Sequence, residues 1–305
     1  MDQEPLKLAP ALLTTPCFGS YQGDSRWGFK PSFRQSLREK KWQWFGAFDA
    51  TMAVGGAIVD VGYACKVFLW AYNRVEHRWW LDATRTLTPR AVVVADAAAS
   101  GLVARGVGLS IHRNDNVWQI SGEFEGCALD LTMTALAMPA TAVCPTPAGW
   151  NVTRKQAALR CSGTISAGAS HTFVDGWGLL DHSHGIMARE TSWLWAMGGG
   201  ATRDGEAIGF NAISGFNADL ENFVWINDTV VALKRVTFEQ GDVWRIHDES
   251  GALDLSLRVD ATRSEALDLK LVRSDYVQPL GLWAGTIGGE SVELYGVAEN
   301  HRATW

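Results

Sequence analysis

Short runs of strand-forming residues, separated by turn residues, recur along nearly the whole chain, and this pattern restricts the fold more than any other feature. In the first half the runs cover residues 42–49, 57–72, 78–82, 91–95, 103–112, 117–124 and 128–135. In the second half they cover residues 158–165, 193–197, 208–214, 223–227, 230–238, 243–248, 252–259, 266–272, 282–287 and 291–299. Only residues 36–41 and 96–102 invite a helix. The pattern is typical of an antiparallel meander and predicts an all-β protein with few short helices.

Turn residues and composition indicate where this series of strands is divided. Residues 1–34 are rich in Pro, Gly, Ser and aromatic residues and predict an irregular N-terminal arm. The best candidate for a link between two halves is a loop with three prolines and a glycine: Pro139, Pro145, Pro147 and Gly149. We therefore expect an N-terminal β-lobe over residues 35–150 and a C-terminal β-lobe over residues 151–305.

Similar residues occur in the same order in both halves. Val117-Trp118-Gln119-Ile120 is followed by Ala128-Leu129-Asp130-Leu131, with a hairpin turn expected at residues 114–116 just before this set. In the second half, Val243-Trp244-Arg245-Ile246 is followed by Ala252-Leu253-Asp254-Leu255. The two spacings differ by an amount that one turn can absorb.

A pair of tryptophans lies upstream of each set. Trp42-Gln43-Trp44 precedes Ala57-Ile58, and Trp193-Leu194-Trp195 precedes Ala207-Ile208. The shared order favours a duplication, in which each copy forms one antiparallel unit. Each unit would be a β-barrel or a strongly curved sheet packed against its twin.

Residues 181–200 contain more groups that could carry chemistry than any other stretch. The segment begins with Asp181-His182-Ser183-His184-Gly185, continues through Arg189-Glu190 to Trp193-Leu194-Trp195, and ends in three glycines at 198–200. Residues two apart share a face of a strand, so the histidines would share one face and the indoles another. The glycines open no helix, and we interpret them as a turn.

Asp181, His182 and His184 are the leading catalytic candidates. Desolvation in an apolar cavity raises the pKa of a carboxyl group, which can then hold and deliver a proton near neutral pH. Asp181 would be the proton donor, His182 its partner or the base that activates water, and His184 a positioning group. The alternative is that Asp181 caps a turn and the histidines bond to backbone carbonyls.

Other side chains would form the walls of a binding site. Trp42, Trp44, Trp193 and Trp195 would exclude water and stabilise positive charge. Arg189 would either bind a substrate carboxylate or form an ion pair with Glu190.

Near the C-terminus, Glu299 and His301 either belong to the contacts of the closing strand or reach the pocket. A metal site at His182 and His184, with His301 or Glu299 as third ligand, is a weaker alternative, because nothing else in the chain has ligand spacing. We expect no metal and no cofactor.

Composition excludes several classes of function. The net charge of −6 gives no reason to expect a nucleic acid or an anionic membrane as partner. No apolar run is long enough for a transmembrane helix, no signal peptide precedes the arm, and five scattered cysteines predict buried, reduced thiols in a cytoplasmic protein. The 15 tryptophans predict core packing, with a minority lining a cavity for an apolar or cationic guest. The GxSxG, GxxxxGK[ST], HExxH and GxGxxG motifs are missing, which disfavours hydrolases, nucleotide enzymes and dehydrogenases.

Several motifs together resemble the bacterial domain-of-unknown-function 2804 family. They are Trp42-Gln43-Trp44-Phe45, Asp60-Val61-Gly62-Tyr63-Ala64, the 181–185 run with Arg189 and Trp193-Leu194-Trp195-Ala196, and Glu299-Asn300-His301-Arg302-Ala303-Thr304-Trp305. More distantly, Asp181, His182 and Gly185 are similar to a motif of the carotenoid hydratase-like proteins. This second resemblance implies a two-lobed lipocalin-like fold. Some relatives in that group hydrate alkenes, and others close rings without a cofactor.

Two functions of different classes follow from these observations. The first is a cofactor-independent acid/base enzyme that acts on a largely apolar molecule, such as a terpenoid, polyene or fatty-acyl compound, as a hydratase, lyase or isomerase. The second is a lipocalin-like binding or carrier protein for a lipophilic ligand, in which the Asp/His run is only turn architecture.

Overall fold

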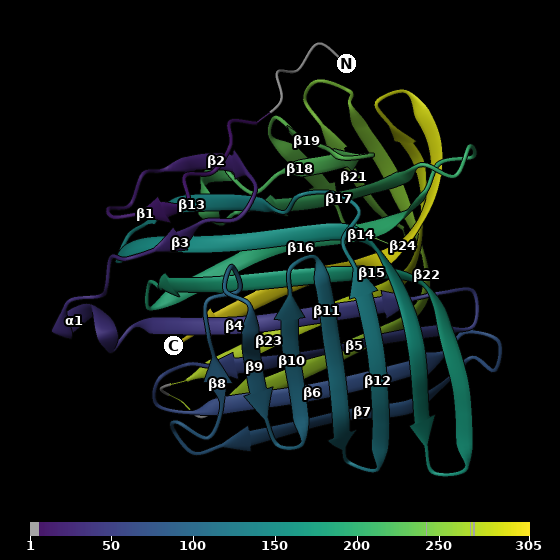
Figure 1. Ribbon diagram of the computed structural model, residues 1–305, viewed down its shortest axis with the longest axis horizontal. Helices are drawn as coiled ribbons and strands as arrows, with labels where there is room; N and C mark the ends of the chain where they lie inside the picture. Colours follow the sequence, from purple (N-terminus) through teal and green to yellow (C-terminus); the bar gives the residue numbers. More distant parts are fainter. Residues whose placement is uncertain (1–5, 242, 269, 271) are drawn as a thin grey trace.

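Two large antiparallel β-sheets make up most of the molecule (Figure 1). The structure, a computed structural model, describes residues 6–241, 243–268, 270 and 272–305. Within these residues the first sheet contains β2 (Gly19–Gln22), β4 (Glu39–Phe48), β5 (Met52–Asp60), β6 (Cys65–Asn73), β7 (Arg78–Leu87), β8 (Val93–Val94), β9 (Gly101–Gly106), β10 (Leu109–Asn114), β11 (Val117–Phe124), β12 (Cys127–Thr134), β13 (Ala140–Thr146), β14 (Gly149–Ala167) and β15 (Ser170–Ile186).

The second sheet follows directly. It contains β16 (Glu190–Ala201), β17 (Ala207–Ser214), β18 (Phe223–Ile226), β19 (Thr229–Ala232), β20 (Val236–Glu239), β21 (Trp244–Asp248), β22 (Leu253–Asp268), β23 (Arg273–Ile287) and β24 (Glu290–Thr304). A small parallel pair, β1 (Leu12–Leu13) with β3 (Arg26–Trp27), the helical turn α1 (Phe33–Ser36) and the 3-10 turn η1 (Asn217–Asp219) complete the described elements. The expectation of two strongly curved antiparallel sheets with few short helices is therefore confirmed.

Both faces of the central strands are buried, in different cores. Phe45 and Ala47 of β4 enter a core enclosed by the first sheet, whereas Trp44 and Phe48 enter a core shared between the two sheets. The second sheet encloses its own core around Trp283. Strands that are buried on both faces carry nearly continuous apolar residues. This is why residues 57–72 look like one interrupted strand, although they form β5 and β6 joined by a hairpin turn at Gly62.

The two sheets have the same order of strands. In the first sheet the order is β7-β6-β5-β4-β15-β14-β12-β11, and in the second it is β19-β18-β17-β16-β24-β23-β22-β21. In both, the first strand of the lobe (β4 or β16) pairs with the last (β15 or β24). This correspondence supports the duplication that the sequence repeats predict.

Strand register distinguishes true repeats from chance ones. Ile120 lies opposite Leu131 in the first sheet, and Ile246 lies opposite Leu255 in the second, so these two motifs are equivalent. The Ala-Ile match fails this test, because Ala57 lies opposite Trp44 whereas Ala207 lies opposite Ala201 near the hairpin end.

Several predicted boundaries differ from the structure. The change of sheet falls between Ile186 and Glu190, not at residues 150/151, so β14 and β15 belong to the first sheet. The proline-containing segment 139–149 is largely β13, which pairs with β14, and is no link between sheets. The helical turn α1 precedes residues 37–41, and residues 96–102 hold turns and the start of β9. These segments are short, and pairing with neighbouring strands outweighs their local preference. The hairpin turn at 114–116 is present.

The three glycines at 198–200 lie within β16 and do not form a turn. An added Cβ at Gly199 would lie 2.7 Å from the backbone nitrogen of Ala158, and one at Gly209 would lie 2.7 Å from Ala157 Cβ. Ala157 and Ala158 form a bulge in β14, where Ala158 adopts φ 56°. The glycines therefore let β14 of the first sheet pack directly on β16 and β17 of the second.

The N-terminal arm is more ordered than predicted. β2 pairs with β13, and Trp27 of β3 donates a hydrogen bond from Nε1 to His184 Nδ1 over 3.0 Å. Among the described cysteines, Cys17 is exposed, the other four are buried, and all five are unpaired. In the described part of the chain, no helix has the length and apolar character needed to cross a membrane.

Candidate functional site

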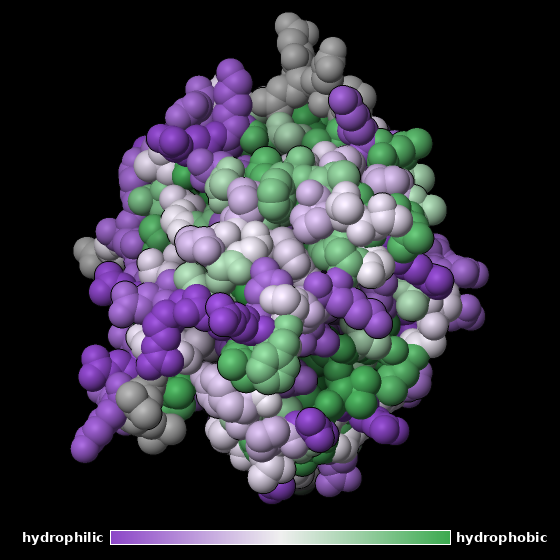
Figure 2. All heavy atoms as spheres, turned by 90° about the vertical axis from the view of Figure 1, so that its left-hand side faces the viewer, coloured by the Kyte–Doolittle hydropathy of each residue, from purple (hydrophilic) through white to green (hydrophobic). Residues whose placement is uncertain are grey.

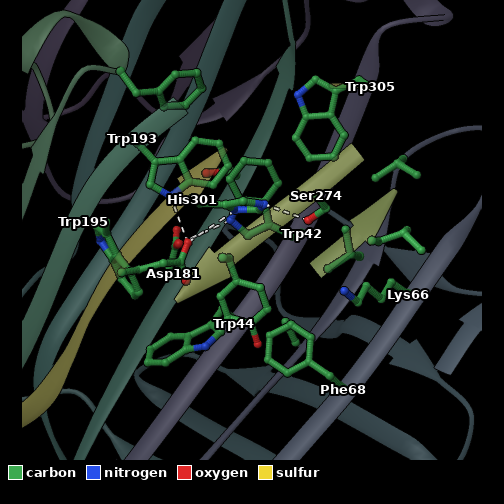
Figure 3. A pocket seen from close by; sticks show the side chains of 18 of the residues that line it. Trp42, Trp44, Lys66, Phe68, Asp181, Trp193, Trp195, Ser274, His301 and Trp305 are labelled. Atoms are coloured by element: carbon green, nitrogen blue, oxygen red, sulfur yellow. Dashed lines mark hydrogen bonds and ion pairs between the residues drawn. The ribbon is translucent and has the colours of Figure 1, made fainter. Parts of the chain in front are cut away.

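A chamber of about 350 Å³ lies where the two sheets face one another. Its walls are mainly apolar and aromatic side chains from both sheets, including Trp42, Trp44, Phe68, Trp193, Trp195 and Tyr276. Figure 3 shows Asp181 and the labelled indoles around one space, with Trp305 and Trp44 at opposite ends of the view. The chamber thus has the size and lining of a small-molecule site.

The two predicted tryptophan pairs meet in this chamber. Trp42 of β4 stacks on Trp193 of β16, with ring centroids 6.4 Å apart and an interplanar angle of 15°. Trp44 meets Trp195 edge to face, with centroids 5.3 Å apart. The pairs lie on equivalent strands of the two sheets, so the duplicated motif builds both halves of one wall.

Asp181 of β15 reaches the same wall. Its carboxylate accepts a hydrogen bond from Trp42 Nε1 over 3.3 Å and one from Lys155 Nζ over 2.5 Å. Lys155 also forms an ion pair with Glu221 over 3.2 Å, so one buried ammonium serves two carboxyl groups. Burial raises the pKa of Asp181, Lys155 lowers it and Glu221 raises it again, and the net direction is upward. The role of Asp181 as proton donor stays a prediction.

A second carboxylate lies on the opposite sheet. Glu299 of β24 accepts hydrogen bonds from Trp193 Nε1 over 2.9 Å and from Gln278 Nε2 over 2.7 Å. His301 Nδ1 lies 3.5 Å from Glu299, and His301 Nε2 is hydrogen-bonded to Ser274 Oγ over 3.0 Å. Burial opposes ionisation of Glu299, but the contacts with His301, Trp193 and Gln278 outweigh it and lower the pKa of this carboxyl.

The two acids occupy equivalent positions in the duplicated fold. Asp181 lies opposite Trp44 in the register of β15 with β4, and Glu299 lies opposite Trp195 in that of β24 with β16. Asp181 accepts a hydrogen bond from Trp42, and Glu299 accepts one from Trp193. Each of these indoles lies two residues before the residue opposite the acid, and the two indoles stack on each other. The chamber therefore holds two related carboxyl groups whose pKa values are shifted in opposite directions.

The two predicted histidines of the 181–185 run lie on the other face of β15. His182 is 2 % exposed and is buried inside the first lobe, where neither ring nitrogen has a hydrogen-bond partner among the described residues. His184 accepts a hydrogen bond from Trp27 and contacts Glu39 over 2.6 Å through Nε2. The predicted roles of His182 as partner of Asp181 and of His184 as a positioning group at the site are therefore wrong. Successive strand residues point to opposite faces, and this separates both imidazoles from Asp181.

Burial favours the neutral form of both histidines. Burial lowers the pKa of His182 well below its usual value and also lowers that of His184, although Glu39 opposes the second shift. Since His184 Nδ1 accepts the indole N–H, the ring proton lies on Nε2 and is donated to Glu39. Their separation from Glu299 and His301 also rules out the weak metal alternative. In the described residues, no group of three or more His, Cys, Asp or Glu is arranged to hold a metal ion.

Arg189 and Glu190 lie outside the chamber. Arg189 Nη1 donates to the backbone oxygen of Trp305, and Glu190 is exposed at the start of β16 opposite Thr304. Neither residue lines the chamber beside Asp181, because the chain turns between β15 and β16. His301, in contrast, lines the chamber as predicted.

Sequence reasoning missed Lys155, Glu221, Ser274 and Gln278. Lys155 stands between Arg154 and Gln156, so no local pattern distinguishes it. It becomes important because β14 pairs with β15 and places Lys155 opposite Asp181. The duplication is the only sequence signal that could have indicated one of these residues, Gln278. Gln278 contacts Glu299 in the second sheet as Lys155 contacts Asp181 in the first.

Comparison with known proteins identifies the family. The family described as a domain of unknown function (DUF2804) matches residues 20–305, and the chain belongs to it. No curated protein matches the sequence.

Solved structures share the fold at low sequence identity. A protein provisionally designated AttH, from Nitrosomonas europaea, is 14% identical with a TM-score of 0.58, covering 90% of this chain and 97% of its own. Kievitone hydratase from Nectria haematococca is 11% identical with a TM-score of 0.55, covering 97% and 98%. CghA, also solved with Sch210972, is 13% identical with a TM-score of 0.57, covering 99% and 97%. These likenesses confirm the two-sheet fold.

Proposed function

From this family's fold and from the two carboxyl groups of the chamber, we propose that the protein is a hydratase-type acid/base enzyme. It acts on a largely apolar small molecule, of the terpenoid, polyene or fatty-acyl class, by adding water, removing it or moving a double bond. One observation carries the proposal: an indole-lined chamber in which the pKa of Asp181 is raised by burial while that of Glu299 is lowered by its hydrogen-bond partners.

The first chemical step is protonation of a double bond by Asp181. The proton leaves the carboxyl group and forms a C–H bond with one alkene carbon, which leaves positive charge on the other. Lys155 Nζ and Trp42 Nε1 already contact Asp181, so they stabilise the carboxylate that results. The stacked indoles Trp42 and Trp193 and the nearby Glu299 stabilise the cation.

The second step differs between the three reactions. In hydration, water forms a C–O bond with the cation and its proton passes to Glu299 or His301. In isomerisation, the cation loses a proton from a neighbouring carbon to the same base. Dehydration is the reverse of hydration. These steps move only protons and water, so they need no redox cofactor.

Among proteins of this fold, kievitone hydratase bears the name of a hydratase. That name supports the reaction class proposed here, whereas the substrate is a separate question. The geometry of Asp181 and Glu299, and not the likeness, is the basis for assigning roles to residues.

The proposal is tested by proton exchange at carbon. Unsaturated terpenoid alcohols, polyenes and unsaturated fatty acids are incubated with the protein in D₂O and examined by mass spectrometry for deuterium or added water. We expect Asp181→Asn to reduce turnover at least about 100-fold, because general acid catalysis contributes about 10²–10⁴-fold. Asp130→Asn, the same change at an exposed residue of β12, should leave turnover unchanged. Equal rates for Asp181→Asn and the unchanged protein would contradict the proposal.

A carrier function is the second candidate. It is favoured by the observation that both carboxylates are already bonded to protein groups, as purely structural carboxylates would be. In that case ligands quench tryptophan fluorescence, and no compound that binds is ever consumed or deuterated.

A further inference from the structure

A second cavity, which we call the antechamber, adjoins the chamber. It has a volume of about 340 Å³ and shares Tyr63, Val272 and Trp305 with the chamber. It lies on the side of the molecule that carries α1 and the C-terminus (Figure 1). Figure 2 shows this side, where hydrophilic side chains lie beside hydrophobic patches. A molecule that fills the chamber can therefore extend into the antechamber, which has a different set of lining side chains.

The antechamber is positively charged. Arg38, Lys40 and Arg189 line it, and none of the described residues that line it is acidic. Arg38 and Arg189 are exposed, whereas Lys40 is buried. The chamber itself is bordered by three acidic side chains, Asp181, Glu221 and Glu299, and by three basic ones, Lys66, Lys155 and Arg273. An excess of basic over acidic side chains is therefore found in the antechamber and not in the chamber.

Lys40 is an unusual residue in this cavity. It is only 1 % exposed, yet no acidic side chain of the described residues forms an ion pair with it. Its Nζ donates one hydrogen bond, to the backbone oxygen of Glu39 over 3.3 Å. It lies 5.2 Å from the ring centre of Tyr63 and 5.8 Å from that of Trp305, the two aromatic rings shared by both cavities.

An ammonium group in this position has unused bonding capacity. A lysine can donate three hydrogen bonds, and burial of a charge without an ionic partner is costly. Burial lowers the pKa of Lys40 to about 8, partly offset by the charges of Asp60 and Glu39, so the charged form still predominates at neutral pH. An anion placed against Nζ would supply the missing partner.

The position of Lys40 on β4 relates it to the proposed catalytic groups. Lys40, Trp42 and Trp44 are successive residues on the face of β4 that borders the two cavities. Positions two apart are separated by about 7 Å along a strand. Asp181 lies opposite Trp44 in the strand register, four residues from Lys40, and its carboxylate accepts a hydrogen bond from Trp42 between them.

We propose that the antechamber binds the anionic head group of an amphiphile, a carboxylate or a phosphate, whose apolar body lies in the chamber. The inference rests on the proposed function in that it assumes an apolar guest in the chamber, and it names the class of substrate. Lys40 supplies the buried contact, and Arg38 and Arg189 supply charge at the rim. The reacting double bond then lies within the apolar body, about 7 to 14 Å from the head group along the direction of β4.

The experiment compares three ligands with the same apolar body: decanoate, decyl phosphate and decanol. Their dissociation constants are measured at neutral pH by titration calorimetry below the concentrations at which they aggregate. We expect at least one anion to bind about tenfold or more tightly than decanol, since a hydrogen bond to a charged group contributes about that factor. The ratio between decanoate and decyl phosphate identifies the preferred head group.

Variants locate the contact. Lys40→Met should abolish the preference for the anions and leave the affinity for decanol unchanged, whereas Lys41→Met, one residue on and on the opposite face, should retain the preference. Arg189→Gln, which leaves the buried residues intact, should weaken the preference partially even if Lys40→Met fails to fold. Asp130→Asn, at an exposed residue of β12 that lines neither cavity, should bind all three ligands as the unchanged protein does.

Two outcomes would overturn the inference. Equal affinity for decanol and both anions would remove the head-group site while leaving the apolar chamber in place. Binding of none of the three would remove the chamber as a ligand site, and with it the basis of both proposals.

Discussion

The pKa values of Asp181 and Glu299 shift in opposite directions because of the side chains that fill one equivalent position. Beside Asp181 that position holds Lys155, which is shared with Glu221, and beside Glu299 it holds the neutral amide of Gln278. Two buried carboxyl groups around one ammonium favour retention of a proton. A carboxyl that accepts bonds from an indole, an amide and an imidazole is instead stabilised as the anion. A difference of a few residues between the two lobes thus gives two equivalent carboxyl groups with opposite pKa shifts.

We expect Lys155→Met to destabilise the protein by about 3–5 kcal/mol, because it leaves two buried carboxyl groups without their cation. The deficit should also depend on pH. Without Lys155 the folded-state pKa of Asp181 rises further above its unfolded value, so stability is fully present below about pH 4 and is lost as pH rises through the folded pKa. The difference from the unchanged protein should therefore shrink on acidification, as measured by urea unfolding at several pH values.

Lys66→Met provides the comparison for this experiment. Lys66 pairs with Glu265 over 2.5 Å, with both side chains about a quarter exposed (23% and 27%). A partly exposed pair contributes about 1 kcal/mol or less. A deficit for Lys155→Met that equals that of Lys66→Met at every pH would show that the triad around Lys155 is not buried as described.

At the scale of elements, the contact of β14 with β16 and β17 positions the site. The bulge at Ala157 and Ala158 lies against Gly199 and Gly209, two residues beyond Lys155. Lys155 Nζ consequently lies 5.6 Å from the ring centre of Trp195 on the other sheet. Close backbone approach at glycines is thus what brings the cation of one sheet to the indole of the other.

We expect Gly199→Val to push the two sheets apart, because its Cβ would lie within 3.0 Å of backbone atoms that cannot yield easily. Overpacking of this kind typically costs about 1–3 kcal/mol, measured by urea unfolding. Ligand affinity of the chamber should fall as well, since Trp44 and Trp195 would separate. Gly241→Ala, where an added Cβ meets no atom within 4 Å, is the control and should change neither quantity. An unaltered stability of Gly199→Val would contradict the described packing.

At the scale of the whole molecule, ion pairs join the two lobes at the rim of the shared core. Arg263 of β22 donates to Asp82 of β7 over 2.5 Å, and Arg74 pairs with Asp260 over 2.7 Å. The guanidinium of Arg263 also lies 4.7 Å from the ring centre of Phe68, a chamber residue. These contacts hold the lobes together where the chamber requires a rigid wall.

We expect Arg263→Ala to cost about 2–3 kcal/mol, because Arg263 is 3% exposed and its loss leaves Asp82 without its charged partner. Arg245→Ala removes an arginine–aspartate pair whose side chains are each 45% exposed, and should cost about 1 kcal/mol or less. Thermal unfolding of the two variants side by side tests this difference. Equal losses would mean that the lobe contact is no more important than a surface pair.

The sequence by itself determined the all-β class, the curved antiparallel sheets and the tryptophan pairs of the chamber wall. These properties follow from local periodicity and from repeated motifs, which are visible along one strand at a time. The alternation of faces along a strand also places Asp181 and His182 on opposite sides. The prediction that His182 is the partner of Asp181 was wrong because residues adjacent in the sequence of a strand do not share a face. Trp-x-Trp, in contrast, was interpreted correctly because residues two apart do share a face.

Only the tertiary structure decided which groups stand beside Asp181. Lys155 reaches it through strand pairing, Glu221 comes from the turn between η1 and β18 of the other lobe, and Glu299 faces it because the two lobes pack through equivalent surfaces. The same packing placed Lys40 in a cavity without an acidic partner. Strand register and the docking of two sheets depend on contacts between residues far apart in the chain, and a periodic pattern within one strand carries no information about them.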